Sequence, residues 1–204
     1  MWPDASQTQE LLARARAGDA AAVNGLLDRH REALRRMVAL RMDRALQQRL
    51  DASDIVQDTL VEANRRLQEY LADPRMPFHL WLRHIARDRL IDAHRRHRVA
   101  ARRSVDREQS LVAPGQVDQS SLDLAAQLCD RELTPAAAAT RYEMQRRFQA
   151  AIERIDERDR EVILLRHFEQ LSNQETAQVL GLTEPAAGMR YLRALRRLRT
   201  FLEG

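Results

Sequence analysis

The sequence predicts an all-α protein of two helical domains, an N-terminal helical bundle and a C-terminal helix-turn-helix domain, joined by a flexible linker. Alanine, leucine and arginine dominate the composition, whereas glycine and proline occur only 6 times each, and such a composition favours helices. Apolar residues recur every three to four positions through most of the chain, as they do on the buried face of a helix. The segment 104–135 lacks this period and is net acidic, so we predict the linker there.

The N-terminal domain, residues 1–103, is expected to contain four helices. Asp51 is placed to cap the third of them, and the two prolines in the stretch 73–77 must end it, because prolines three positions apart cannot continue a helix. The expected helices are a short one around residues 11–15 that stops near Gly18, followed by 20–41, 52–71 and 78–98.

The C-terminal domain, residues 136–204, is expected to contain helices at 136–155 and 158–170, followed by a helix-turn-helix at 171–198. Ser172 and Glu175 have the S-x-x-E spacing of a capping box, which marks the start of the first helix of this motif.

The turn and the second helix of the motif have their own signals. Gly181 is suited to the left-handed residue that ends a helix, Thr183 can cap the next one, and Pro185 falls in its first turn. At about 100° per residue, this helix has an apolar stripe on one side and arginines on the other. The stripe contains Ala187, Tyr191, Ala194, Leu195 and Leu198, and the arginines are Arg190, Arg193, Arg196 and Arg197. A cationic face that serves DNA binding and a merely solvated face of a terminal hairpin both fit this pattern.

Composition excludes several classes of function. All 34 basic residues are arginine and the net charge is +4, which permits a nucleic-acid partner. The chain has one cysteine, Cys129, no glycine-rich phosphate loop and no H-E-x-x-H motif, so we expect no enzyme activity, no cofactor and no bound metal. We also expect a cytoplasmic protein, because the first residues lack a signal-peptide pattern and no apolar stretch approaches the roughly 20 residues of a membrane span.

Three segments, in this order, resemble the sigma-70 family of bacterial transcription initiation factors, specifically its small two-domain extracytoplasmic-function type. They are DASDIVQDTLVEA at 51–63, FHLWLRHIARDRLIDAHRRH at 78–97, and 152–198, which includes IDERDREVILL. The resemblance implies a sigma factor that binds core RNA polymerase and directs promoter-specific, DNA-dependent transcription initiation. It implies core polymerase binding, −10 recognition and promoter melting for residues 1–103, and −35 recognition for residues 136–204. Core RNA polymerase and promoter DNA are then the expected partners, and an anti-sigma factor is a candidate third.

The segment 51–63 resembles the helix that grips the polymerase clamp. Acidic and amide groups suit a basic coiled-coil partner, although an ordinary solvated helix face would have the same composition. The candidate clamp-binding residues are Asp54, Ile55, Gln57, Asp58 and Val61. The acidic linker likewise fits either a simple spacer or, by resemblance, a segment that threads the positively charged channel of the polymerase.

The segment 78–97 resembles the helix that melts the promoter and reads the −10 element. By resemblance, the loop before it borders the pocket for a flipped base, and its prolines would stiffen that loop. Trp81 can stack on an unpaired base, or it can belong to the core together with Phe78. The arginines would track the DNA backbone. The candidate residues are Pro74, Pro77, Trp81, Arg83, His84, Arg87, Arg95 and Arg96.

The second helix of the helix-turn-helix resembles the −35-reading helix. Arg190 and Arg193 are the best candidates for contacts to bases or adjacent phosphates, and Arg196 and Arg197 for phosphates alone. Gly188 stands where the family often has a basic or polar residue, which removes a candidate DNA contact and leaves part of the −35 preference to DNA shape. The candidate residues are Thr183, Ala186, Met189, Arg190, Arg193, Arg196 and Arg197.

Two other functions fit parts of the sequence. An autonomous DNA-binding regulator would use the helix-turn-helix to read an operator and the N-terminal half for sensing or dimerisation. An adaptor would sequester another regulator through its helical faces. The N-terminal half argues against both, because a stand-alone repressor has no reason to carry both DASDIVQD and FHLWLRHIARDRLID.

Overall fold

The computed structural model describes residues 2–42, 44–103 and 138–203, and these residues contain helices and no strand. The all-α class is therefore confirmed. The chain divides into two compact units, Met1–Ala113 and Pro114–Gly204, which are described separately. The predicted linker at 104–135 lies outside the described residues.

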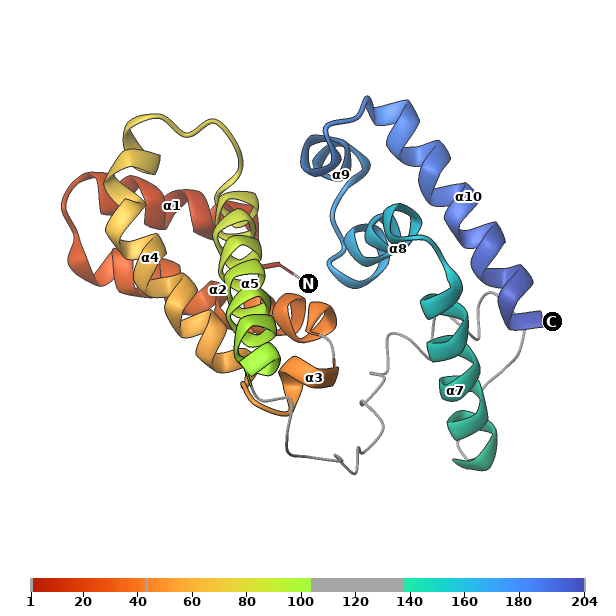
Figure 1. The fold of residues 1–204 in the computed structure, drawn as a ribbon. Helices are drawn as coiled ribbons and strands as arrows, with labels where there is room; N and C mark the ends of the chain where they lie inside the picture. Colours follow the sequence, from red (N-terminus) through yellow and green to blue (C-terminus); the bar gives the residue numbers. More distant parts are fainter. Residues whose placement is uncertain (1, 43, 104–137, 204) are drawn as a thin grey trace. The chain divides into compact units, whose positions relative to one another are not determined.

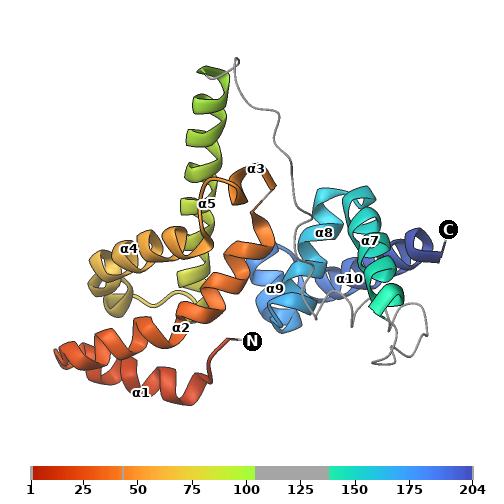
Figure 2. The same cartoon turned by 90° about the horizontal axis from the view of Figure 1, so that it is seen from below.

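The N-terminal unit is a helical bundle in which α2 packs against α1, α4 and α5, and α4 packs against α5 (Figures 1 and 2). Its elements are α1 (Ala5–Arg16), α2 (Ala20–Arg41), the short α3 (Arg44–Gln47), α4 (Ala52–Ala72) and α5 (Phe78–Arg103). The predicted bounds of α2 are confirmed. The short helix α3 was not predicted, and α1 begins well before the predicted segment.

Aspartates start three of these helices. The side chains of Asp4, Asp19 and Asp51 each accept hydrogen bonds from backbone N–H groups of the first turn, which otherwise have no partner within the helix. At α4 the bonding is reciprocal, since Asp54 Oδ2 accepts from the backbone N–H of Asp51 at 3.2 Å. The hydrogen bond from the backbone of Ser53 holds the pKa of Asp51 below its usual value, so this cap remains ionised at neutral pH.

The core of the N-terminal unit combines aliphatic side chains from the four long helices with a buried histidine. His30 is 1% exposed, and its Nδ1 donates a hydrogen bond to the carbonyl oxygen of Leu26 at 2.8 Å. The Phe78 ring stands edge-on to its imidazole, with 5.1 Å between the ring centroids. Burial in these surroundings lowers the pKa of His30 from 6.5 to about 4, so the imidazole is neutral at physiological pH.

The C-terminal unit is built around α10, which packs against α7, α8 and α9 (Figure 1). Its elements are α7 (Ala138–Arg154), α8 (Glu157–Ile163), the π-helical turn η1 (Leu164–Phe168), α9 (Asn173–Leu180) and α10 (Glu184–Glu203). The sequence predicted one helix over 158–170, whereas the structure has α8 followed by η1. Gln170, with φ 56°, then turns the chain, because the left-handed conformation ends the helical hydrogen bonding.

Candidate polymerase and nucleic-acid interfaces

A groove of about 490 Å³ runs between α4 and α5 and is lined almost entirely by charged side chains. Glu62 on α4 and Arg89 on α5 form an ion pair across it, with 3.0 Å between Oε2 and Nη2. The lining residues are Asp58, Val61, Glu62, Arg65, Arg89, Asp92, Arg95 and Arg96. The structure thus brings two clamp candidates, Asp58 and Val61, into one groove with two DNA candidates, Arg95 and Arg96.

The clamp candidates on α4 fall into two groups. Asp54, Gln57, Asp58 and Val61 are exposed, and the apolar Val61 is exposed to 45%. Ile55 is only 4% exposed and belongs to the hydrophobic core, so its predicted place on the binding surface is corrected. The reason is helical periodicity: one position after Asp54, the side chain turns inward to the face that packs against α2.

The loop 73–77 is tied to the end of α4 by specific contacts. The Tyr70 hydroxyl donates to the carbonyl oxygen of Met76 at 2.9 Å, and Arg75 pairs with Asp73 at 2.6 Å. Pro74 and Pro77 are both exposed within this loop. The expected stiffness of the loop therefore has a second source besides its prolines, namely a side chain anchored in the core.

Trp81 lies at the start of α5 and packs against the core while remaining partly exposed. Its ring centroid lies 4.7 Å from that of Tyr70 and 5.4 Å from that of Phe78. The core interpretation of Trp81 is thus confirmed for the packed part of the ring. Base stacking by the remaining part stays a prediction.

The basic candidates on α5 do not all lie on its surface. Arg83 is 0% exposed, which corrects its predicted place on a DNA-tracking face, because its position in the helical period points inward beside Leu82. Arg87, Arg95 and Arg96 are exposed, as predicted. His84 is half-buried, and burial lowers its pKa below 6.5, with the charge of Arg83 acting in the same direction.

The helix-turn-helix has the predicted caps. Ser172 and Glu175 exchange hydrogen bonds across the start of α9, and Gly181 ends α9 with φ 63°. Thr183 Oγ1 accepts from the backbone N–H of Ala186 at 3.4 Å at the start of α10. Local sequence therefore specifies where both helices of this motif begin and where the first one ends.

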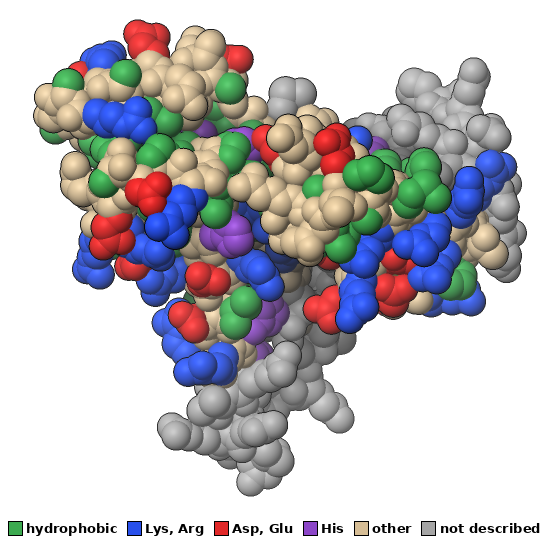
Figure 3. All heavy atoms as spheres, turned by 90° about the horizontal axis from the view of Figure 1, so that it is seen from above, with side chains coloured by type: hydrophobic (Ala, Val, Ile, Leu, Met, Phe, Trp, Pro, Cys, Tyr) green, Lys and Arg blue, Asp and Glu red, His purple; other side chains and the backbone are tan. Residues whose placement is uncertain are grey.

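The predicted two-faced character of α10 is also confirmed. Ala187, Ala194 and Leu198 are fully buried in the C-terminal core, whereas Arg193 and Arg196 are exposed. Neither arginine forms an ion pair with a residue that the structure describes. On the face visible in Figure 3, arginine and acidic side chains lie close to one another, so charges of both signs are mixed over this face.

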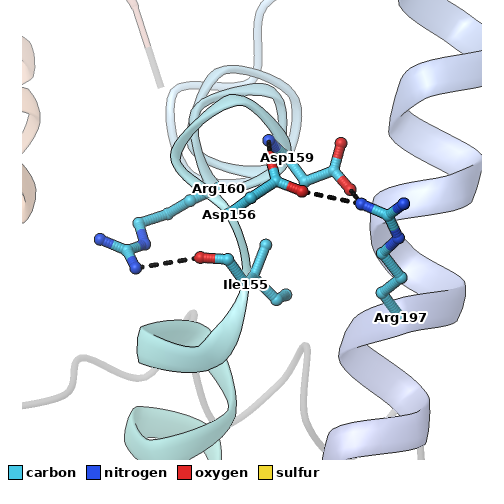
Figure 4. A network of polar contacts seen from close by, with 5 residues as sticks. All are labelled: Ile155, Asp156, Asp159, Arg160 and Arg197. Atoms are coloured by element: carbon cyan, nitrogen blue, oxygen red, sulfur yellow. Dashed lines mark hydrogen bonds and ion pairs between the residues drawn. The ribbon is translucent and has the colours of Figure 1, made fainter.

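Arg197 differs from these arginines because it holds α10 against α8 (Figure 4). Its Nη1 donates to Asp156 Oδ2 at 2.7 Å and to Asp159 Oδ2 at 2.5 Å. Asp156 also caps α8, and Asp159 is buried, so this network fixes the second helix of the motif on its support. The guanidinium is therefore engaged within the protein, and its predicted phosphate contact would compete with two carboxylates.

Gly188 faces α9. A Cβ built at this position would lie 3.4 Å from Asn173 Nδ2, and that amide donates to the carbonyl oxygen of Glu184 at 2.8 Å. The first atom of a side chain here would therefore contact Asn173. The expectation that Gly188 removes a DNA contact stays a prediction.

Replacing Gly188 with alanine is expected to stabilise the C-terminal unit by about 0.5–1 kcal/mol, because glycine in a helix interior costs conformational entropy. The new methyl group would be in van der Waals contact with Asn173. Differential scanning calorimetry should show a raised melting temperature. Gly25→Ala in α2 is the matched control, since its Cβ would meet only Leu11 Cδ2, at 3.8 Å. A lowered melting temperature for Gly188→Ala alone would mean that the Asn173 hydrogen bond was broken.

Sequence reasoning missed three residues that shape this unit: Asn173, Asp156 and Asp159. The capping potential of Asp156 could have been recognised from its position before α8. Its pairing with Arg197, 41 positions later, carries no local signal, because such a contact exists only after the helices pack.

Neither a metal site nor a membrane span is indicated by the described part of the chain. No cluster of three His, Cys, Asp or Glu side chains suited to a metal ion occurs among residues 2–42, 44–103 and 138–203. None of the described helices combines the length and apolar character that a membrane span requires.

Comparison with known proteins identifies both units. Residues 26–99 match the family model of sigma-70 region 2, and residues 145–198 match that of sigma-70 region 4. CnrH, an RNA polymerase sigma factor of Cupriavidus metallidurans, is 33% identical over 154 residues, which cover 75% of this chain and 74% of CnrH. BldN, an ECF RNA polymerase sigma factor of Streptomyces coelicolor, is 29% identical over 199 residues, covering 98% of this chain and 67% of BldN.

The fold agrees with these sequence matches. The solved structure of CnrH in complex with the cytosolic domain of CnrY is similar with a TM-score of 0.58 and 27% identity, covering 98% of each chain. The resemblance that the sequence suggested is confirmed, and it points to a regulatory, non-catalytic family. The chain therefore belongs to the sigma-70 family of RNA polymerase sigma factors, of the extracytoplasmic-function type, and serves promoter-specific transcription initiation by RNA polymerase.

Proposed function

We propose that the two units divide promoter recognition between them. Residues 1–103 bind core RNA polymerase, recognise the −10 element and melt the duplex, whereas residues 136–204 recognise the −35 element. The observation that carries this proposal is the groove between α4 and α5, where Asp58 and Val61 lie beside Arg95 and Arg96. A stand-alone DNA reader has no need for an acidic and apolar helix face next to an arginine-rich one.

In the N-terminal unit, the clamp surface consists of Asp54, Gln57, Asp58 and Val61, which α4 exposes together. Ile55 supports this surface from the core. Melting and −10 recognition fall to the loop with Pro74 and Pro77 and to the exposed or partly exposed side chains of α5. Those side chains are Trp81, His84, Arg87, Arg95 and Arg96.

In the C-terminal unit, α10 enters the major groove of the −35 element, as the second helix of a helix-turn-helix does. Arg193 and Arg196 meet the DNA from the exposed face, and Arg190 does so from its half-buried flank. Thr183, Ala186 and Met189 lie at the N-terminal end of the helix, where base edges are contacted. Arg197 contributes by holding the helix in place.

We further infer that a partner protein restrains this factor, as an anti-sigma factor does. CnrH has been solved in complex with the cytosolic domain of CnrY. Val61, which belongs to the clamp surface, and Ile91 on α5 are exposed to 45% and 50% and offer apolar contacts for such a partner. Because the family acts on RNA polymerase, we place the protein in the cytoplasm and assign it no enzymatic activity of its own.

The direct test is reconstitution of the full chain with core polymerase, followed by run-off transcription on fragments of the genome that encodes it. We expect transcripts from discrete promoters that share −35 and −10 elements, and co-purification of the chain with core enzyme. An absence of both promoter-dependent transcripts and core association would overturn the proposal.

If the two units divide promoter recognition, a substitution in α10 should impair binding to promoter DNA without impairing binding to core enzyme. In the reconstituted holoenzyme, Arg193→Ala should weaken binding to promoter duplex about tenfold. The variant loses one contact between a guanidinium group and a phosphate or base of the DNA. Association with core enzyme should not change. Arg146→Ala in α7, which removes another exposed arginine of the same unit, is the matched control. Binding can be measured by fluorescence anisotropy, and an equal loss of core association in Arg193→Ala would contradict the assignment of α10.

A further inference from the structure

The outward face of α10 carries an apolar residue, Met189, in line with the exposed Arg196. Met189 is 56% exposed, while Ala187, Ala194 and Leu198 on the other side of the helix are fully buried. At about 100° per residue, Met189 lies opposite the middle of that buried stripe. Its side chain therefore projects from the centre of the face that the proposed function directs into DNA.

The surroundings of Met189 favour DNA over a protein as the occupant of this face. Arg193 and Arg196 follow Met189 one and two turns later, are exposed, and form no ion pair with a described residue. An apolar protein surface would have to bury these charges without compensation, whereas the phosphates on either side of a major groove neutralise them.

An exposed apolar side chain has one specific target in the major groove. Among the groups on the base edges there, the C5-methyl group of thymine is the apolar one, and the others donate or accept hydrogen bonds. Methionine is unbranched and polarizable, so it adapts its shape to such a methyl group. Ala186, also exposed, precedes Met189 by three residues and lies about 5–6 Å from it on the helix surface. Successive bases of one strand are about 3.4 Å apart, so these two side chains reach neighbouring or next-neighbouring bases.

We propose that Met189, assisted by Ala186, determines the sequence preference of this factor by contacting thymine methyl groups in the −35 element. The proposal rests on the proposed function, in which α10 occupies the major groove at that element. It adds a direct apolar contact to the part of the preference that was expected to depend on DNA shape. The arginines then supply position and affinity, while the methionine selects thymine.

The test removes the methyl group from the DNA. A duplex library randomised at the −35 position is first selected with the reconstituted holoenzyme, and each thymine of the selected element is then replaced by deoxyuridine. This replacement keeps every hydrogen-bonding group and deletes only the methyl group. We expect the affinity to fall about three- to fivefold at one or two positions, the effect of exposing one buried methyl group.

Variants assign the effect to a side chain. In holoenzyme containing Met189→Ala, thymine and deoxyuridine duplexes should bind equally at the position that Met189 contacts. Leu192→Ala is the matched control, because Leu192 is exposed to 49% on the same helix but lies away from the outward centre. It should retain the preference for thymine. Arg193→Ala should weaken binding to both duplexes while leaving their ratio unchanged.

The possible outcomes distinguish the role of Met189 from the proposed function of α10 at the −35 element. Selection of a −35 element that lacks thymine, or equal affinity for thymine and deoxyuridine at every position, overturns the role of Met189 and leaves the proposed function intact. Loss of the thymine preference in Leu192→Ala alone also overturns it. Failure to select any −35 element refutes the proposed function and the inference together. If Met189→Ala impairs core association instead of DNA binding, the face belongs to a protein interface.

Discussion

Replacing Asp58 with lysine should lower the affinity of this sigma factor for core RNA polymerase by more than 100-fold. Asp58 is exposed, lines the groove between α4 and α5, and forms no ion pair with a described residue, so its charge is free for a basic partner. A lysine would place like charges against each other at the clamp interface, which costs several kcal/mol. Size-exclusion chromatography and a binding titration with core enzyme measure the effect.

The design of this variant follows from a difference between the two aspartates. Asp54 belongs to the capping box of α4, so Asp54→Lys also costs about 0.5–1 kcal/mol of helix stability. The double replacement should abolish assembly, but Asp58→Lys is the cleaner variant. Glu10→Lys in α1 makes the same charge change at another exposed position of the same unit and should leave assembly intact. Normal assembly of Asp58→Lys would remove α4 from the clamp interface.

Acid should destabilise the N-terminal unit well before the carboxylate caps are titrated. The pKa of His30 is lowered from 6.5 to about 4, so the unfolded chain binds this proton more tightly than the folded one. Stability is therefore complete above pH 6.5 and falls as the pH drops to 4, by about 3 kcal/mol at and below that value. The cause is mainly the cost of placing a charged imidazole in an apolar core.

Guanidinium unfolding at pH 7, 5.5 and 4 tests this expectation. Trp2 and Trp81 are the 2 tryptophans of the chain and both lie in the N-terminal unit, so their fluorescence reports on that unit alone. In His30→Leu, most of the pH dependence between 6.5 and 4 should disappear. His84, whose pKa is also lowered, contributes a smaller part because it is only half-buried, and His84→Gln isolates that part. An unchanged pH dependence in His30→Leu would show that another group carries the acid sensitivity.

Local signals account for the parts of the fold that the sequence predicted well. The bounds of α2 were predicted from the apolar period that runs through it and from the break near Gly18, and in the structure Asp19 caps this helix. The helix-turn-helix was predicted in detail because Ser172, Glu175, Gly181 and Thr183 act on their own backbone neighbourhood. The short helix α3 escaped prediction because a few residues offer too little periodicity. The π-helical turn after α8 was missed because its sequence is an ordinary helical one.

In the candidate sites, too, some features were predicted from the sequence and others were not. The family resemblance placed Asp58 and Val61 on a surface, and helical position did the same for Arg193 and Met189. All four are exposed in the structure. The sequence analysis did not distinguish the exposed arginines of α5 from the buried Arg83, because arginine is usually a surface residue and all of them were expected there. A buried cation is tolerated only where packed neighbours compensate for its lost hydration, and those neighbours are not adjacent in sequence.

By itself, the sequence determined the all-helical class, the caps of α4, α9 and α10, and the family. Helices and caps depend on residues within a few turns of one another, and the family is identified by short motifs in a fixed order. Only the tertiary structure decided that Arg197 joins α10 to α8, that Gly188 faces Asn173, and that the α4 and α5 candidates share one groove. These features are contacts between helices that pack across the core. Their energies depend on distance and burial, which a helical period does not encode.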